Sequence, residues 1–297
     1  MPMIKRLLPI FVALLFCAVT GCNKPNNTPQ IAATTLPVYE FTSQLCNGTD
    51  ICVSQLINEN VSCLHNYTLQ VNQMRTIESV QVLILSGAGL EDFMGDILET
   101  PNIIIDASVN VPVINAENAH EHAHSHDHGI DHHCDSHIWL SPANARIMSQ
   151  NIYNSLVRIF PEHTNRFTEN LNVLLAEIDT LEQYGTTQLS ALACRNLITF
   201  HDGFAYFAEA FDLSILKSVE EESGSEVAAS ELIEIIELVH DYNLPAIFTE
   251  KNGSTAAASV IEAETGVSVF ELDMAMAGDS YFDAMYYNID TLKEAFG

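Results

Sequence analysis

The chain has 297 residues, and its 39 acidic against 11 basic residues give a formal net charge of −28 with histidine neutral. This charge argues against nucleic acid or an anionic membrane surface as a partner, because both repel an acidic protein, and it mildly favours a cationic ligand. The length is enough for two domains of ordinary size, each with its own core.

The N-terminus has the layout of a secretory signal. Two basic residues precede the apolar run Leu7–Val19, which is shorter than the roughly 20 residues that a membrane-spanning helix needs. Residues 1–21 are therefore predicted to be a cleaved signal peptide. Cys22 directly follows the small residues of the cleavage site, a pattern typical of bacterial lipoproteins in which this cysteine is acylated.

We expect residues 22–30 to form a lipid-anchored tether. The protein would then be extracytoplasmic and anchored to the cell membrane, or periplasmic. The alternative is an ordinary cleaved signal in which Cys22 is a chance thiol.

Residues 31–160 are predicted to form an N-terminal α/β lobe. Short apolar runs alternate there with helical patterns, and strand–helix–strand alternation implies a parallel sheet covered on both faces. The expected strands are Ile31–Thr34, Ile51–Ile57, Val80–Ser86 and Ile103–Asp106, and the expected helices are Leu36–Cys46, Leu69–Ser79 and Leu90–Leu98.

A histidine-rich loop, residues 120–133, interrupts this lobe. Its histidines alternate with acidic and small residues and almost no apolar ones, so it cannot bury a core and is predicted to be disordered without metal. The auxiliary metal-binding histidines of this loop are His120, His122, His124, His126, His128, His132 and His133.

His137 is separated from that loop by Cys-Asp-Ser and is predicted to be well positioned. It precedes Ile-Trp-Leu, and the next helix starts with Ser141 as N-cap and Pro142 at its first position. The alternative is that His137 is merely the last histidine of the loop, but the aromatic residue beside it argues against this. Elsewhere in the chain, His163 and His240 are interpreted as solvated surface histidines.

Residues 161–192 are predicted to be a connecting helix, because their apolar residues recur at intervals of three and four. Some 30 residues of helix span roughly 45 Å, long enough to run along both lobes. Residues 193–297 form the predicted C-terminal α/β lobe. Its expected strands are Leu197–Phe200, Leu213–Val219, Ala246–Thr249 and Val267–Leu272. The predicted fold class is α/β, with two lobes whose parallel sheets are joined by a long rigid helix.

Four polar residues follow predicted strands. His201, Glu250 and Asp273 each come directly after a strand of the second lobe, and His65 lies in the loop after a strand of the first. Ligands of open α/β sheets bind beyond the carboxyl ends of the strands. We therefore expect these side chains to converge in the cleft between the lobes.

Five cysteines remain after Cys22, an odd number that leaves at least one unpaired in an exported protein. A local bridge across the turn-like Asn-Gly between Cys46 and Cys52 is one alternative, and the sequence does not fix the connectivity. The five are Cys46, Cys52, Cys63, Cys134 and Cys194.

Five strings occur in order across residues 31–297: SCLHNYTL, LSGAGLEDFM, DSHIWLSPANA, ITFHDGFAYFAEAFDL and DSYFDAMYYNIDTL. Together they resemble the metal-binding solute receptors of ABC transporters, in particular the zinc-uptake branch with its histidine-rich insert. The resemblance implies a monomeric, high-affinity Zn²⁺ receptor that delivers zinc to an ABC membrane permease. It also implies two lobes joined by a long helix, with metal bound at their interface.

The same resemblance implies a ligand set. His65, His137 and His201 match the three histidine ligands, and Asp273 matches the carboxylate that is the fourth ligand in some members. The chain departs from the family where TEKNGS replaces the usual Glu-Pro, so Glu250 is only a candidate for supporting a ligand. Cys63 and Cys134 lie beside two of the ligands and leave the fourth position open, because a thiolate binds Zn²⁺ more strongly than a carboxylate does.

Three imidazoles and one carboxylate suit tetrahedral Zn²⁺. Mn²⁺ prefers more oxygen, although a manganese or other divalent-metal receptor of the same family remains an alternative. Two other classes are a zinc hydrolase and an extracellular metal buffer or adhesin. The hydrolase is disfavoured because the chain has no His-Glu-x-x-His helix and Asp273 would close the open position of the metal. We therefore expect no enzymatic activity.

Overall fold

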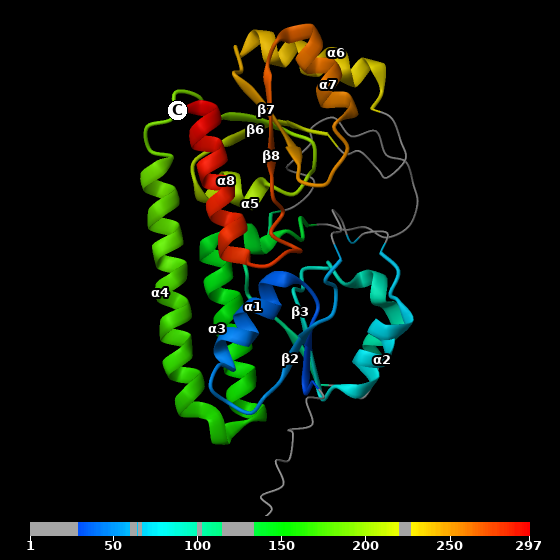
Figure 1. Cartoon of the computed structure of the whole chain (residues 1–297), viewed down its shortest axis with the longest axis vertical. Helices are drawn as coiled ribbons and strands as arrows, with labels where there is room; N and C mark the ends of the chain where they lie inside the picture. Colours follow the sequence, from blue (N-terminus) through cyan, green and yellow to red (C-terminus); the bar gives the residue numbers. More distant parts are fainter. Residues whose placement is uncertain (1–28, 60–63, 65–66, 100–102, 115–133, 220–226) are drawn as a thin grey trace, which may run out of the picture.

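The computed structural model describes residues 29–59, 64, 67–99, 103–114, 134–219 and 227–297 (Figure 1). The predicted signal peptide, Cys22, Cys63, His65 and the histidine-rich loop lie outside these residues. Two four-stranded parallel sheets lie toward opposite ends of the molecule's long axis. The predicted α/β class with two lobes is confirmed. Within the described part of the chain, every helix is too short or too polar to span a bilayer.

The N-terminal sheet has the strand order β2-β1-β3-β4. The two central strands, β1 and β3, are buried along their whole length, as expected of continuous apolar runs in a sheet covered on both faces. All four strands lie within the predicted ranges: β1 is Ile31–Ala33, β2 Val53–Gln55, β3 Val82–Leu85 and β4 Ile103–Asp106.

Helices α1 (Leu36–Leu45) and α2 (Val71–Ser79) cover opposite faces of this sheet (Figure 1). The predicted α-helix at Leu90–Leu98 is wrong in type. The structure has a 3-10 helix, η1 (Asp92–Glu99), which is broken at Gly95 with φ 47°. That backbone conformation is open to glycine and incompatible with a continuous α-helix.

The C-terminal sheet has the order β6-β5-β7-β8. Helices α5 (Ala205–Ala210) and α8 (Tyr281–Phe296) lie on one face, and α6 (Ala229–Asp241) and α7 (Ala256–Thr265) on the other (Figure 1). The strands are β5 (Asn196–Thr199), β6 (Ser214–Ser218), β7 (Ala246–Glu250) and β8 (Ser268–Leu272), each within one residue of the prediction at both ends.

Both sheets therefore have the same topology. In each, the first and third strands of the lobe pair at the centre, β1 with β3 and β5 with β7. The direction of chain progression across the sheet reverses between these two strands, and open α/β sheets place a crevice at the carboxyl ends of such a pair. Residues that follow β5 and β7 are thus in position to line a binding site.

Two long helices pack against each other, α3 (Pro142–Ile159) beside the N-terminal sheet and α4 (Thr164–Gln188) along both sheets (Figure 1). The 25 residues of α4 span about 37 Å, and α4 contacts α1 of the N-terminal half and α8 of the C-terminal half. Its buried positions include most of the predicted apolar stripe: Phe167, Leu171, Leu174, Ile178 and Leu181. The exact domain boundaries given above stay a prediction.

A continuous apolar core joins the two halves of the molecule. The Tyr281 ring meets Phe41 of α1 edge-on at 5.0 Å between centroids. Its hydroxyl donates to the Trp139 carbonyl at 2.8 Å, and Trp139 itself is fully buried in the short 3-10 helix η3 (Ile138–Leu140). Because such interiors are close-packed, the residues next to η3 are held in place by both halves.

The local disulfide considered for Cys46 and Cys52 is absent. Both are free thiols, and so are the other two described cysteines, Cys134 and Cys194. Cys46 lies in the core at the end of α1, and burial raises the pKa of its thiol to about 12. That thiol therefore stays protonated and inert at neutral pH.

Candidate metal centre

His137 is held between the predicted loop and η3. Its side chain is buried, and the ring packs edge-on against Trp139 with 5.4 Å between centroids. The indole Nε1 of Trp139 donates in turn to the Met274 carbonyl at 2.8 Å. Asp135 Oδ1 lies 2.8 Å from His137 Nδ1 and also accepts a hydrogen bond from the His137 backbone N–H. The ring is thus fixed in place and in orientation.

His201 lies just beyond the end of β5 and is fixed by the neighbouring strand. Its Nδ1 is 3.1 Å from Glu250 Oε2, and Glu250 is the buried last residue of β7. The His201 carbonyl accepts from the Thr199 hydroxyl at 3.0 Å. Strand pairing between β5 and β7 therefore places the carboxylate directly behind the imidazole.

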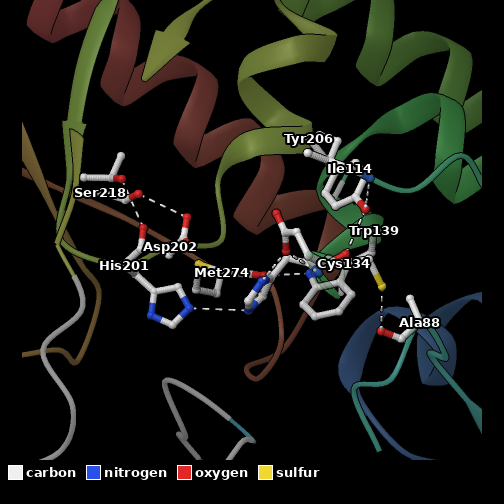
Figure 2. A network of polar contacts seen from close by, with 12 residues as sticks. Ala88, Ile114, Cys134, Trp139, His201, Asp202, Tyr206, Ser218 and Met274 are labelled. Carbon is white, nitrogen blue, oxygen red and sulfur yellow. Dashed lines mark hydrogen bonds and ion pairs between the residues drawn. The ribbon is translucent and has the colours of Figure 1, made fainter. Parts of the chain in front are cut away.

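The two imidazoles face each other, with 3.3 Å between their Nε2 atoms and an angle of 87° between the rings (Figure 2). A carboxylate at each Nδ1 favours the tautomer that carries its proton on Nδ1 and directs the Nε2 lone pair outward. Two such lone pairs repel each other unless a cation lies between them. Tetrahedral Zn²⁺ with bonds of 2.0–2.1 Å separates two nitrogen ligands by about 3.3 Å, so the pair fits this metal.

Gly203 is packed against both histidines. A Cβ atom there would lie 2.5 Å from Met274 Cε, 2.8 Å from His201 Cδ2 and 3.0 Å from His137 Cγ. These distances are too short for ordinary contact, so a side chain at this position would push the two rings apart or displace Met274. The absence of a side chain at Gly203 is a condition for the observed spacing of the imidazoles.

Asp273 directly follows β8, as predicted, but the structure gives it other partners than the histidines. Its Oδ2 is 3.1 Å from Lys251 Nζ, and its Oδ1 accepts from the Ala275 N–H at 2.8 Å. The hydrogen bond with Asp273 raises the pKa of Lys251, so Lys251 stays positively charged at neutral pH. Among the residues that the structure describes, no group of three or more His, Cys, Asp and Glu side chains is arranged to hold a metal.

Cys134 contacts the N-terminal half of the molecule. Its thiol donates to the Ala88 carbonyl over 3.7 Å (Figure 2). Burial, together with the nearby charges of Asp135 and Asp92, raises the pKa of this thiol. Cys134 is thus a thiol that donates a hydrogen bond, and it would have to lose its proton before it could bind a metal as a thiolate.

The remaining predicted residues are placed as follows. His163 Nε2 pairs with Asp50 at 2.9 Å, just ahead of α4, and His240 is exposed near the end of α6. The site thus consists, in the described part of the chain, of His137 and His201 with Asp135 and Glu250 behind them.

Comparison with known proteins decides the family. The family model described as ZnuA, the periplasmic component A of the zinc-uptake complex, matches residues 31–295. The chain belongs to this family. The resemblance found in the sequence is therefore confirmed, and the ZnuA family is one of solute receptors.

Several known proteins are similar to most of this chain. The zinc-binding lipoprotein AdcA of Streptococcus pneumoniae strain R6 is 26% identical over 308 residues, which cover 99% of this chain and 61% of that protein. AdcA of Streptococcus pyogenes serotype M6 is 24% identical over 89% of this chain and 55% of its own length. The chain thus spans little more than half of these relatives. A putative metal-binding protein of Chlamydia trachomatis is 23% identical over 95% and 97% of the two chains.

Solved structures agree with this assignment. A crystal structure of ZnuA superposes with a TM-score of 0.77 at 26% identity, covering 91% of this chain and all of that one. The Zn(II)-bound ZnuA-like domain of Streptococcus pneumoniae AdcA has a TM-score of 0.74 at 23% identity, over 90% and 98% of the two chains. At that level of identity the second likeness concerns the fold alone.

Sequence reasoning missed two residues of this site, Asp135 and Gly203. Each lies two positions from a histidine that was singled out, Asp135 before His137 and Gly203 after His201. The signal for Asp135 was a carboxylate close enough in sequence to reach the imidazole of the same turn. The signal for Gly203 was a glycine between a candidate metal ligand and a helix. Other side chains can approach the backbone closely at such a position because glycine has no side chain of its own.

Proposed function

We propose that this protein is an extracytoplasmic, high-affinity Zn²⁺ receptor that delivers zinc to an ABC importer. The observation that carries the proposal is the pair of imidazoles whose Nε2 atoms are 3.3 Å apart, each with a carboxylate at its Nδ1. A carboxylate behind a histidine fixes the tautomer and raises the basicity of the ligand, an arrangement typical of metal sites. Membership of a family described by zinc uptake supports the same metal.

The ligands that we propose are His65, His137, His201 and Asp273, with Glu250 supporting His201. Three neutral nitrogens and one carboxylate match the preferences of Zn²⁺, whereas Mn²⁺ favours more oxygen ligands. A fourth protein ligand leaves no coordination position for an activated water, so we propose that the protein is not an enzyme.

The remaining parts of the proposal rest on the sequence. Cys22 is the proposed site of a lipid anchor to the cell membrane, and residues 22–30 are the tether. The histidine-rich loop, 120–133, would collect metal ions with weak affinity near the cleft. An ABC-transporter permease is the proposed partner, and we propose that the receptor acts as a monomer with no affinity for nucleic acid.

Competition between the mature chain and a chromophoric chelator tests the proposal. Purified protein that begins after residue 22, stripped of metal, is titrated with Zn²⁺ and separately with Mn²⁺ in the presence of the chelator. We expect one tight Zn²⁺ site per chain and much weaker Mn²⁺ binding. Absence of a tight stoichiometric Zn²⁺ site would refute the receptor function, and a tighter Mn²⁺ site would assign the chain to a manganese receptor instead.

A further inference from the structure

Lys251 neutralises the carboxylate that the proposed zinc site needs. Its Nζ lies 3.1 Å from Asp273 Oδ2, and its side chain is half exposed whereas that of Asp273 is mostly buried. In the sequence Lys251 directly follows Glu250, which holds His201. Two neighbouring residues at the end of β7 therefore fix two of the proposed ligands, one through an imidazole and one through a carboxylate.

The rest of Asp273 is fixed independently of Lys251. The Asn288 side chain accepts from the Asp273 N–H and donates to the Asp273 carbonyl, both at 2.7 Å. The other carboxylate oxygen, Oδ1, accepts from the Ala275 N–H. Backbone position and one oxygen are thus set by neutral hydrogen bonds, and the charge of the carboxylate is balanced at Oδ2 by Lys251.

Asp273 is also tied closely to the imidazole pair. The next residue, Met274, accepts from the Trp139 indole through its carbonyl, and its Cε lies 2.5 Å from the position that a Cβ atom on Gly203 would take. For Asp273 to serve as the proposed zinc ligand, its side chain must rotate toward the imidazoles while Asn288 holds the backbone in place. That rotation breaks the contact with Lys251.

Lys251 has other acceptors when it leaves Asp273. Both residues line an open cavity of about 410 Å³ whose wall also includes Asp279 and Asp283. The Lys251 ammonium already lies 5.5 Å from the centroid of the Tyr287 ring, within the range of a cation–π interaction. The ammonium therefore stays stabilised on the cavity wall after the exchange.

We propose that Lys251 competes with the bound metal for Asp273, so that zinc binding exchanges one cation for another at this carboxylate. The inference rests on the proposed function, in which Asp273 is a ligand. The cost of displacing Lys251, and the repulsion between its ammonium and the metal nearby, weaken the affinity for Zn²⁺. The same displacement cost and repulsion also speed the release of Zn²⁺, which suits a receptor that must give up its cargo.

Lys251→Gln tests the competition, because it removes the positive charge and keeps a polar side chain of similar length. An exposed ion pair of this kind contributes modestly, and the nearby cation adds to the effect. We therefore expect the Zn²⁺ affinity of the variant to rise by about fivefold. Chelator competition measures the affinity, and stopped-flow mixing of the loaded protein with excess chelator measures the release rate, which should fall.

Two matched variants serve as controls. Lys251→Arg keeps the cation and should bind and release Zn²⁺ like the parent. Lys217→Gln removes the same charge elsewhere, since Lys217 pairs with Glu231 and Glu234 in another part of the C-terminal half. An equal gain of affinity in Lys217→Gln would show that only the net charge of the protein matters and would overturn the proposal.

The double variant Lys251→Gln with Asp273→Asn separates this inference from the proposed function. Once the carboxylate is gone there is nothing to compete for and only the repulsion between the ammonium and the metal remains, so the Lys251 change should raise the affinity clearly less in that background than in the parent. Unchanged or weaker binding by Lys251→Gln alone, or an equal gain with and without the Asp273 carboxylate, overturns the competition. If the parent itself lacks a tight Zn²⁺ site, the receptor function is what fails.

Discussion

The two sheets share one topology, yet their buried glutamates have different partners. Glu250, at the end of β7, faces Nδ1 of His201, whose other nitrogen faces His137. Glu91, in the loop after β3, accepts from the Thr34 hydroxyl at 2.5 Å and from two backbone N–H groups of its own loop. Burial raises the pKa of Glu91 to about 7.

This difference shows what topology does and does not decide. The strand order brings polar groups to the carboxyl ends of the central strands in both halves of the molecule. Glu250 supports a metal site because its partner is an imidazole, and a carboxylate at Nδ1 raises the basicity of the ligand nitrogen on the other side of the ring. The Glu91 carboxylate, whose donors are a hydroxyl and two backbone N–H groups, instead closes its loop onto the sheet.

The largest effect is expected from removing an imidazole. His201→Ala or His137→Ala takes away a direct nitrogen ligand. We expect the Zn²⁺ affinity to fall by more than about 100-fold, because mutation of a residue that only supports a ligand already lowers metal affinity by about 10- to 100-fold. Chelator competition measures the change. His240→Ala, an exposed histidine on α6, is the control and should bind like the parent. Parent-like binding by His201→Ala would remove the imidazole pair from the site.

The next test compares the two glutamates directly. Glu250→Gln leaves the His201 ring in place but replaces the negatively charged carboxylate at its Nδ1 with a neutral amide, and we expect about 10- to 100-fold weaker Zn²⁺ binding. Glu91→Gln changes a carboxylate of equal burial at the other sheet and should leave the affinity close to the parent value. If both variants lose affinity equally, the contrast between the two carboxylates is wrong.

The third test uses the pH dependence of stability. A carboxyl whose pKa is raised from 4.5 to about 7 in the folded protein holds its proton more tightly than in the unfolded chain. Its stabilisation is therefore fully present below pH 4.5 and is lost as the pH rises through 7, by about 2 kcal/mol between pH 5 and 7. Denaturant unfolding of the metal-free parent and of Glu91→Gln over this pH range measures the contribution of Glu91 to the free energy of unfolding.

Other groups titrate in the same range, so the quantity of interest is the difference between the two proteins. The free energy of unfolding of Glu91→Gln should fall less steeply with pH than that of the parent. Equal slopes would show that Glu91 is already ionised at pH 5 and that its three hydrogen bonds outweigh its burial.

The sequence predicts the fold well and the site only in part. Strand positions follow from short apolar runs, which local pattern alone identifies. His137 and His201 stand out because each is next to a predicted element boundary. Glu250 was singled out by its position after a strand, but its pairing with His201 depends on strand order, which the sequence does not state.

Contacts between distant segments were the harder part. The pairing of Lys251 with Asp273 joins the ends of two strands more than twenty residues apart in the chain, and no local pattern encodes it. The bridge between Cys46 and Cys52 was considered because the two are close in sequence, but burial of Cys46 in the core leaves its thiol unpaired. Closeness of two cysteines in the sequence is a weak guide to disulfide pairing where the backbone directions are unknown.

The smallest effect is expected from Tyr206→Phe, which tests how far the carboxylate behind His137 depends on the backbone around it. The Tyr206 hydroxyl donates to the Asp135 carbonyl at 2.8 Å and accepts from the Ile114 N–H at 2.9 Å (Figure 2). The Asp135 N–H also donates to the Ile114 carbonyl at 2.9 Å, so one hydroxyl ties together the two segments that flank the histidine-rich loop.

Loss of two hydrogen bonds should lower the free energy of unfolding by about 1–2 kcal/mol. The direct bond between Ile114 and Asp135 remains in the variant, so Asp135 should stay behind His137 and the Zn²⁺ affinity should fall by less than about tenfold. Chemical denaturation of the metal-free protein and chelator competition measure the two quantities, and Tyr153→Phe, whose hydroxyl bonds Thr168 at the surface, is the control. A loss of affinity as large as that of Glu250→Gln would mean that Tyr206, rather than the local turn, sets the position of Asp135, and that the two carboxylates behind the imidazoles are held in place by different means.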